Sequence, residues 1–253
     1  MGLKAARKRQ DDMLLVLGTL GALTVIELLT RRVEWSSRAT NLQAWAYYIA
    51  AVAIVLPAVQ YSVPVSLVSD APPWIGIPLY VAVNDLGEYL FHRAQHASPI
   101  LWRMHSLHHS DHDVNATTTQ RHFWGDPILK GVTIWPLAAL VIAPTPTASA
   151  VYVTIGLWNF VSHAAIDLDF GKWSWLLNSP AYHRRHHSAL PEHFNSNFAA
   201  LFPIFDVLAG SYRRPEGHPP TGLEDRPRNA REVLLWPLHG IAFGRRTVVT
   251  DPI

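Results

Sequence analysis

The chain has 253 residues, of which 49% are hydrophobic and only 16% are charged, well below the roughly 25% of an ordinary soluble domain. It contains 14 histidines and no cysteine, which excludes a disulfide scaffold, an iron–sulfur cluster, a zinc ribbon and a cysteine nucleophile. A net charge of +2 is too small to argue for binding to nucleic acid. With ten tryptophans, the composition points to a membrane protein.

The first apolar segment covers residues 13–30 and holds one acid, Glu27. Its length is close to the minimum for a membrane-spanning helix, about 20 residues. Because no small-residue cleavage site follows it, we expect a retained anchor and not a signal peptide. Further apolar segments follow at 42–60, 74–91, 128–143 and 148–166, with a shorter, interfacial one at 232–244.

Pro144-Thr145-Pro146 separates the last two long segments and predicts a helical hairpin. These patterns predict an all-α fold, an integral membrane helical bundle of about four to five apolar segments. Arginines and lysines concentrate in 92–127 and 172–231, which places both stretches on one face, the cytoplasmic one. Either three crossings precede residue 92 and the N-terminus lies on the opposite face, or one early segment does not cross.

Histidines gather in the two polar stretches on that face. His92 and His96 stand four residues apart, so they share one face of a helix with Asp85 and Glu88. Acids on an apolar helix are costly and suggest a function. We expect Glu88, one turn before His92, to accept the ring N–H of that histidine and fix its tautomer.

Two further groups have the same spacing, His105-x2-His108-His109 and His183-x2-His186-His187, and His163 ends the returning arm of the hairpin. Several imidazoles on one face repel when protonated, so the pattern makes sense when they are neutral and bound to metal. Nine imidazoles exceed the need of one ion, and two metals are therefore expected.

Imidazole suits iron, zinc, copper and nickel alike, so the spacing alone does not choose the metal. Two redox irons fit oxygen activation on chemical grounds. Two other classes stay open: a histidine-rich membrane protein for metal binding or transport, and a zinc-dependent membrane hydrolase. The first should place its ligands along a path inside the membrane, whereas these histidines follow the helix ends.

The motifs HRAQH, LWRMHSLHHSDHDVNATTTQR, SPAYHRRHHSALPEHFNSNF and FPIFDVLAGSY resemble the fatty acid hydroxylase/sterol desaturase superfamily of membrane di-iron enzymes. The resemblance runs from about residue 80 to 214. It implies a histidine-rich helical cap facing the cytosol and O2-dependent hydroxylation or desaturation of a lipid, of sterol or fatty acyl type. It also implies electrons from a separate ferredoxin or cytochrome-type protein, and two iron ions that zinc can replace in purified protein. The metal ligands it implies are His92, His96, His105, His108, His109, His163, His183, His186 and His187.

A second set of residues is expected around those ligands or as an occasional extra ligand. It comprises Asp85, Glu88, His112, His122, Asn159, His193, Asn197 and Asp206. The chain is expected to divide into N-terminal membrane segments (1–73), a catalytic domain (74–214) and a C-terminal interfacial tail (215–253). Of the two reactions, hydroxylation is the favoured interpretation.

Overall fold

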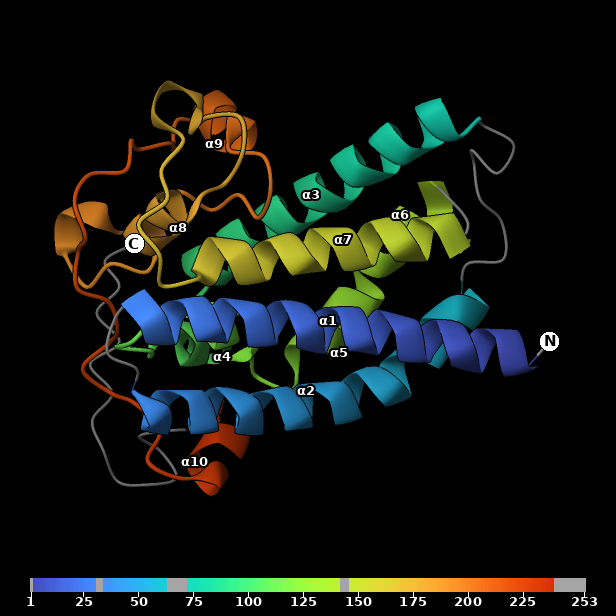
Figure 1. Ribbon diagram of the computed structural model, residues 1–253, viewed down its shortest axis with the longest axis horizontal. Coiled ribbons are helices and arrows are strands. Elements are labelled where there is room, and N and C mark those ends of the chain that lie inside the picture. Colours follow the sequence, from blue (N-terminus) through green and yellow to red (C-terminus); the bar gives the residue numbers. More distant parts are fainter. Residues whose placement is uncertain (1, 31–33, 63–71, 142–145, 239–253) are drawn as a thin grey trace.

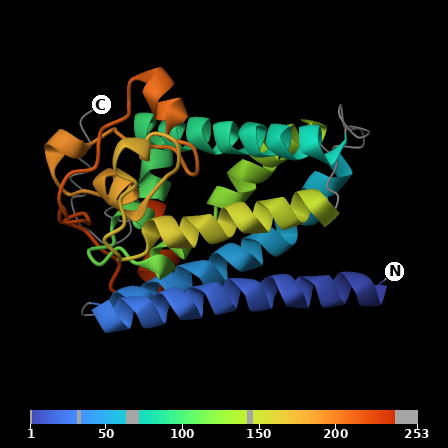
Figure 2. The same ribbon diagram turned by 45° about the horizontal axis from the view of Figure 1, so that its top comes forward.

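The computed structural model describes residues 2–30, 34–62, 72–141 and 146–238, and their regular structure is helical, as predicted, apart from one isolated bridge between Ser188 and Thr221. Four long helices run side by side, and most of the shorter elements lie toward one end of them (Figures 1 and 2). The long helices are α1 (Gly2–Thr30), α2 (Trp35–Ser62), α3 (Pro73–Ala97) and α7 (Pro146–His163). The shorter elements are α4 (Pro99–His109), η1 (Ala116–Gln120), α5 (Asp126–Val132), α6 (Ile134–Val141), η2 (Gly171–Trp173), α8 (Pro180–His186), η3 (Pro191–His193), α9 (Ile204–Ala209), α10 (Ala230–Leu234) and η4 (Trp236–Leu238).

Two helices are long and apolar enough to cross a bilayer within the part of the chain that the structure describes, at Met13–Thr30 and Trp35–Ala58. Only 17% of each segment is buried, whereas the core helix of a soluble protein is mostly covered. Leu14, Leu29 and Ile54 are among the exposed side chains. An exposed apolar surface of this extent suits lipid, which supports a membrane protein.

The predicted segment 128–143 is divided between α5 and α6, which break at Thr133, where the backbone leaves the helical region (φ −123°, ψ −80°). Its residues 142 and 143 lie outside the described residues. With seven and eight residues, each of these helices is too short to span a bilayer. The end of α6 and the start of α7 lie at the end of the bundle away from α8 and α9 (Figure 1), where the hairpin turn was expected.

The direction of the long helices brings particular termini together. The C-terminal ends of α1, α3 and α7 lie at the end of the bundle that carries α8 and α9, and α1 begins at the opposite end (Figure 1). The chain therefore runs along the bundle three times before residue 92. The C-terminal ends of α3 and α7 therefore meet the short elements that follow them, among them α4, η1, α8 and α9. We call this end of the protein the cap.

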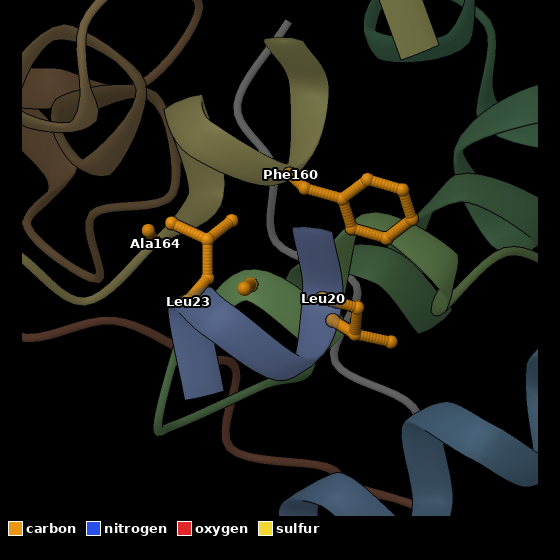
Figure 3. Close-up of a cluster of buried hydrophobic side chains, with 5 residues drawn as sticks. Leu20, Leu23, Phe160 and Ala164 are labelled. Atoms are coloured by element: carbon orange, nitrogen blue, oxygen red, sulfur yellow. The ribbon is translucent and has the colours of Figure 1, made fainter. Parts of the chain in front are cut away.

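Helix α1 packs against the end of α7 through small and apolar side chains. Leu20 and Leu23 of α1 face Phe160 and Ala164, with Ala116 of η1 completing the cluster (Figure 3). All five are buried. This contact fixes α1 beside the helix that carries His163.

A buried carboxylate joins four segments at the same place. Glu27 of α1 is fully buried, and its Oε1 accepts hydrogen bonds from the backbone N–H of Ala116 (2.9 Å) and of Ala165 (2.7 Å). Its Oε2 accepts one from Arg38 Nη2 of α2 at 2.6 Å. The acid that stood out in an apolar segment thus ties α1 to α2, to η1 and to the chain after α7.

The described part of the expected C-terminal tail packs on the cap. In η4, Trp236 is buried with Leu107 and Phe123, and its indole N–H donates to Ser106 of α4 at 2.9 Å. Residues 239–253, and with them the part of the segment 232–244 that follows η4, lie outside the described residues.

Replacing Glu27 tests this junction. We expect Glu27→Ala to lower the free energy of unfolding by about 3–5 kcal/mol, because it leaves the buried guanidinium of Arg38 without its counter-charge. Glu34→Ala removes a half-exposed partner of Arg226 and should cost less than about 1 kcal/mol. Thermal unfolding in detergent measures both, and equal losses would show that Glu27 is not a junction.

Candidate metal centre

The two helices that carry the HxxHH motifs begin in the same way. Ser98 and Ser179 are N-cap residues whose hydroxyls accept a hydrogen bond from a backbone N–H three residues later, and Pro99 and Pro180 follow them. Serine at the N-cap and proline at the first helical position both favour helix initiation. Short helices of 11 and seven residues are thereby fixed in place at the cap.

All nine predicted ligand histidines come together, in two groups. Each residue offers one ring nitrogen, and within a group these nitrogens lie within 4.8 Å of one another. The five-histidine cluster contains His92, His96, His105, His109 and His186; the four-histidine cluster contains His108, His163, His183 and His187.

Each HxxHH helix serves both clusters. In α4, the i and i+4 residues His105 and His109 join the five-histidine cluster, and His108 joins the other. In α8 and its C-cap residue His187 the assignment is reversed: His183 and His187 join the four-histidine cluster, and His186 joins the five-histidine cluster. The rings of His109 and His187 stack with centroids 4.5 Å apart, so the clusters adjoin.

The separations between ring nitrogens match those of ligands on a shared ion. In the four-histidine cluster, Nε2 of His163 lies 3.2 Å from that of His108 and 2.9 Å from that of His183, which lies 3.2 Å from Nε2 of His187. Metal–nitrogen bonds of about 2.1 Å at angles of about 90–110° place two ligand nitrogens about 3.0–3.4 Å apart. Nε2 of His105 and His109 are also 3.2 Å apart.

Backbone carbonyls set the orientation of three of these rings. Nδ1 of His92 lies 2.7 Å from the carbonyl of Phe198, Nδ1 of His186 lies 2.9 Å from that of Ser196, and Nδ1 of His163 lies 2.8 Å from that of Asn159. A neutral ring that donates from Nδ1 keeps a lone pair on Nε2. Nε2 of His92 and of His186 is buried without a hydrogen-bond partner, as expected of an atom that awaits an ion. The residues therefore fit a metal.

The surroundings keep the cap histidines neutral. Burial, and after it the neighbouring imidazoles, lower the pKa of His105, His109, His183 and His187 well below the usual value. Burial lowers the pKa of His186 to about 4. Deprotonated imidazoles are the form that binds metal, so the cap is prepared for ions at neutral pH.

Three of the residues expected around the ligands hold the loop that supplies the carbonyls. Asp206 is buried and accepts hydrogen bonds from the backbone N–H of Phe198 and Ala199 and from the hydroxyls of Tyr182 and Ser211. Asp85 accepts from the backbone N–H of Leu201 and Phe202, both at 2.9 Å.

Asn197, with a left-handed φ of 61°, clamps the same loop to the chain at Arg213 through a pair of hydrogen bonds. Asparagine tolerates this backbone conformation better than most residues. These side chains act on the ligands through the backbone, and they present Ser196 and Phe198 to His186 and His92.

The expectation for Glu88 was wrong. Its carboxylate binds Lys130 Nζ at 2.7 Å, and His92 donates to the carbonyl of Phe198 instead. The lysine lies 42 residues further along the chain, so a reading of helix periodicity could not include it.

The remaining expected residues lie in different places around the clusters. His112 is exposed and contacts the carbonyl of Leu223, and His193 contacts the hydroxyl of Ser188. Asn159 takes part through its backbone carbonyl. His122 stacks on His108, with ring centroids 4.6 Å apart. Sequence analysis did not identify Asp126, which groups with His105 and His122. The pattern that could have indicated it is its position four residues after His122.

Apolar helices with exposed faces and two adjoining buried histidine clusters at one end define a membrane protein with a candidate two-metal centre. Comparison with known sequences gives the family. The fatty acid hydroxylase family matches residues 77–211, more than half of the chain and a range that includes all nine histidines, so the chain belongs to this family.

Curated relatives share the same region at moderate identity. Alkylglycerol monooxygenase of Xenopus tropicalis is 33% identical over 141 residues, 55% of this chain and 31% of the relative. An ornithine lipid hydroxylase of Rhizobium tropici is 28% identical over 139 residues, 55% of this chain and 42% of the relative. A Delta(7)-sterol 5(6)-desaturase of Aspergillus fumigatus is 26% identical over 173 residues, 57% of this chain and 51% of the relative. The matched parts thus cover about half or less of these relatives, and no solved structure matches the chain.

Asp206→Asn should weaken metal binding without touching a ligand. The amide retains one oxygen where two backbone N–H groups now find a carboxylate, so the loop that orients His92 and His186 shifts. We expect the metal affinity to fall about 10–100-fold, the usual effect of losing a group that orients a ligand. Metal content after dialysis against a graded chelator measures it. Asp169→Asn, at an exposed carboxylate, is the matched control, and an equal fall in both variants would contradict this role.

Acid should destabilise the metal-free protein. A histidine whose pKa is lower in the folded state binds fewer protons there, so its contribution is intact above the unfolded pKa of about 6.5 and is lost as the pH falls toward the folded value. From its shift to about 4, His186 alone should cost about 2 kcal/mol between pH 7 and pH 5. Thermal unfolding of chelator-treated protein at the two values tests this, and His186→Gln should flatten the difference. Equal stability of the unmodified chain at both values would contradict it.

Proposed function

We propose that this protein is a membrane-bound di-iron oxygenase that hydroxylates a C–H bond of a lipid with O2. The observation that carries the proposal is the pair of adjoining histidine clusters at the end of apolar helices. The nine histidines are the proposed ligands, five for one ion and four for the other. The residues 74–214 are the proposed catalytic domain, between membrane segments at 1–73 and an interfacial tail at 215–253.

Bound iron would supply the activation of O2 and the oxidation of an unactivated C–H bond, which no side chain can perform. The chain's own residues hold the ligands neutral, aim their Nε2 atoms at two centres, and keep bulk water from most of the rings. Imidazole suits zinc as well as iron. Iron is proposed because relatives that share this region are named as a monooxygenase, a hydroxylase and a desaturase.

The proposed substrate class follows from the setting of the cap. The helices α1, α3 and α7 end on the same side of the bundle (Figure 2), and the clusters include His92 and His96 of α3 and His163 of α7. The exposed apolar side chains of these helices support a lipid that approaches the clusters from the bilayer. Hydroxylation is preferred to desaturation because two of the three relatives described above are named for oxygen insertion. The cap is proposed to face the cytoplasm, on the basis of its arginines, and to receive electrons from a separate ferredoxin or cytochrome-type protein.

Lipid turnover by membranes that contain the protein tests the proposal. We expect product only with O2 and an electron donor, and label from 18O2 in the hydroxyl group of the product. His108→Ala and His186→Ala, one in each cluster, should each lower turnover by about 100-fold or more, since each removes a ligand of one ion.

His218→Ala is the matched control, because this exposed histidine pairs with Asp167 away from both clusters. An unsaturated product without label would identify a desaturase. Turnover without O2, with one zinc ion per chain, would identify a hydrolase, and full turnover by both cluster variants would overturn the assignment to these residues.

A further inference from the structure

Asp126 differs from the other buried carboxylates of the described residues. It is 1% exposed, and neither of its oxygens has a hydrogen-bond partner. Nδ1 of His122 lies 3.3 Å from Oδ2 but is not aligned for a hydrogen bond. The carboxylate of each of the other five accepts at least two hydrogen bonds: Glu27, Asp85, Asp111, Asp206 and Glu232.

A buried carboxylate without partners is costly and calls for a positive charge. The cation would have to lie next to Asp126, and the side chains there supply further ligands. One ligand atom each of His105, His122 and Asp126 lie within 4.8 Å of one another. Two imidazoles and a carboxylate are a common ligand set for divalent transition metals such as iron(II). Two ligands of one ion lie at most about 4.2 Å apart, so binding needs only a small contraction.

The position of this group lies between solvent and the inner clusters. The side chain of His122 is 24% exposed, and its ring stacks on His108, with the two planes 7° apart. His105 belongs to the group and also to the five-histidine cluster, where its Nε2 lies 3.2 Å from that of His109. An ion held by this group would therefore share its ligand His105 with the inner centre.

We propose that His105, His122 and Asp126 form a third divalent-metal site, from which ions pass to the inner histidine clusters. This inference rests on the proposed two-metal centre. Because His105 serves both positions, the third site holds an ion during loading and releases it when His105 turns to His109. Asp126 supplies there the negative charge that the nine neutral imidazoles lack, and it attracts the incoming cation.

Cobalt(II) loading of the full chain in detergent tests the proposal. The protein is first stripped with a chelator; cobalt absorption is then followed in time, and bound metal per chain is counted after removal of free ions. We expect Asp126→Asn to slow loading at least tenfold, with the final count equal to that of the unmodified protein, two ions per chain. Asp126→Glu keeps the carboxylate and should restore much of the rate. Asp169→Asn removes an exposed charge and should load at the unmodified rate.

The outcomes separate this proposal from the metal centre on which it rests. Unchanged loading in Asp126→Asn, with two ions bound by the unmodified protein, would overturn the third site alone. A reduced final count in Asp126→Asn would make Asp126 a permanent part of the centre and would also overturn the loading role. No binding by the unmodified protein would overturn the centre itself. The metal-free Asp126→Asn variant should in addition unfold at a higher temperature than the unmodified protein, because it no longer buries a carboxylate that accepts no hydrogen bond. A lower temperature would count against that premise.

Discussion

Nine imidazoles can share one small volume only while they are neutral, and the construction of the cap follows from that constraint. Protonated rings at centroid distances of 4.1–5.3 Å within each cluster would repel strongly. Burial removes the water that would favour protonation. Carbonyl acceptors then fix the proton of three rings on Nδ1, which leaves Nε2 to point inward. Burial at the cap thus keeps the rings neutral, and the carbonyl acceptors there direct the Nε2 atoms inward.

The crossed use of the HxxHH motifs makes the two clusters a single unit. Consecutive residues of a helix point about 100° apart, so His108 and His109 reach different clusters, as do His186 and His187. Each HxxHH motif thus gives a pair of ligands to one cluster and a single ligand to the other. Neither helix can move without disturbing both sites. The loop from Ser196 to Phe202 also connects α8 to α3. Asp85 of α3 and Asp206 accept hydrogen bonds from its backbone, and its Ser196 carbonyl contacts His186 of α8.

Much of this site could be predicted from the sequence because its information is local. Helical spacing alone places His105 with His109, and His183 with His187, on common faces. The partners of the rings are remote: His92 and Phe198 are 106 residues apart, and Glu88 and Lys130 are 42 apart. Periodicity offered Glu88 as the partner of His92 because it was the nearest acid along the helix. Likewise, the apolar content of 128–143 gave no sign of the break at Thr133.

Buried polar groups of the long helices and of the cap differ in whether they have partners within the protein. In the long helices, where apolar surroundings make an unpaired charge most costly, Glu27 is paired with Arg38 and Glu88 with Lys130. At the cap, by contrast, Asp126 and the inward Nε2 atoms of His92 and His186 are buried without hydrogen-bond partners. Glu27 and Glu88 are paired within the protein, so the groups at the cap without such partners indicate a ligand from outside the chain. Divalent cations would satisfy the lone pairs and the carboxylate together, and the stability of the cap would then depend on the same ions as its proposed chemistry.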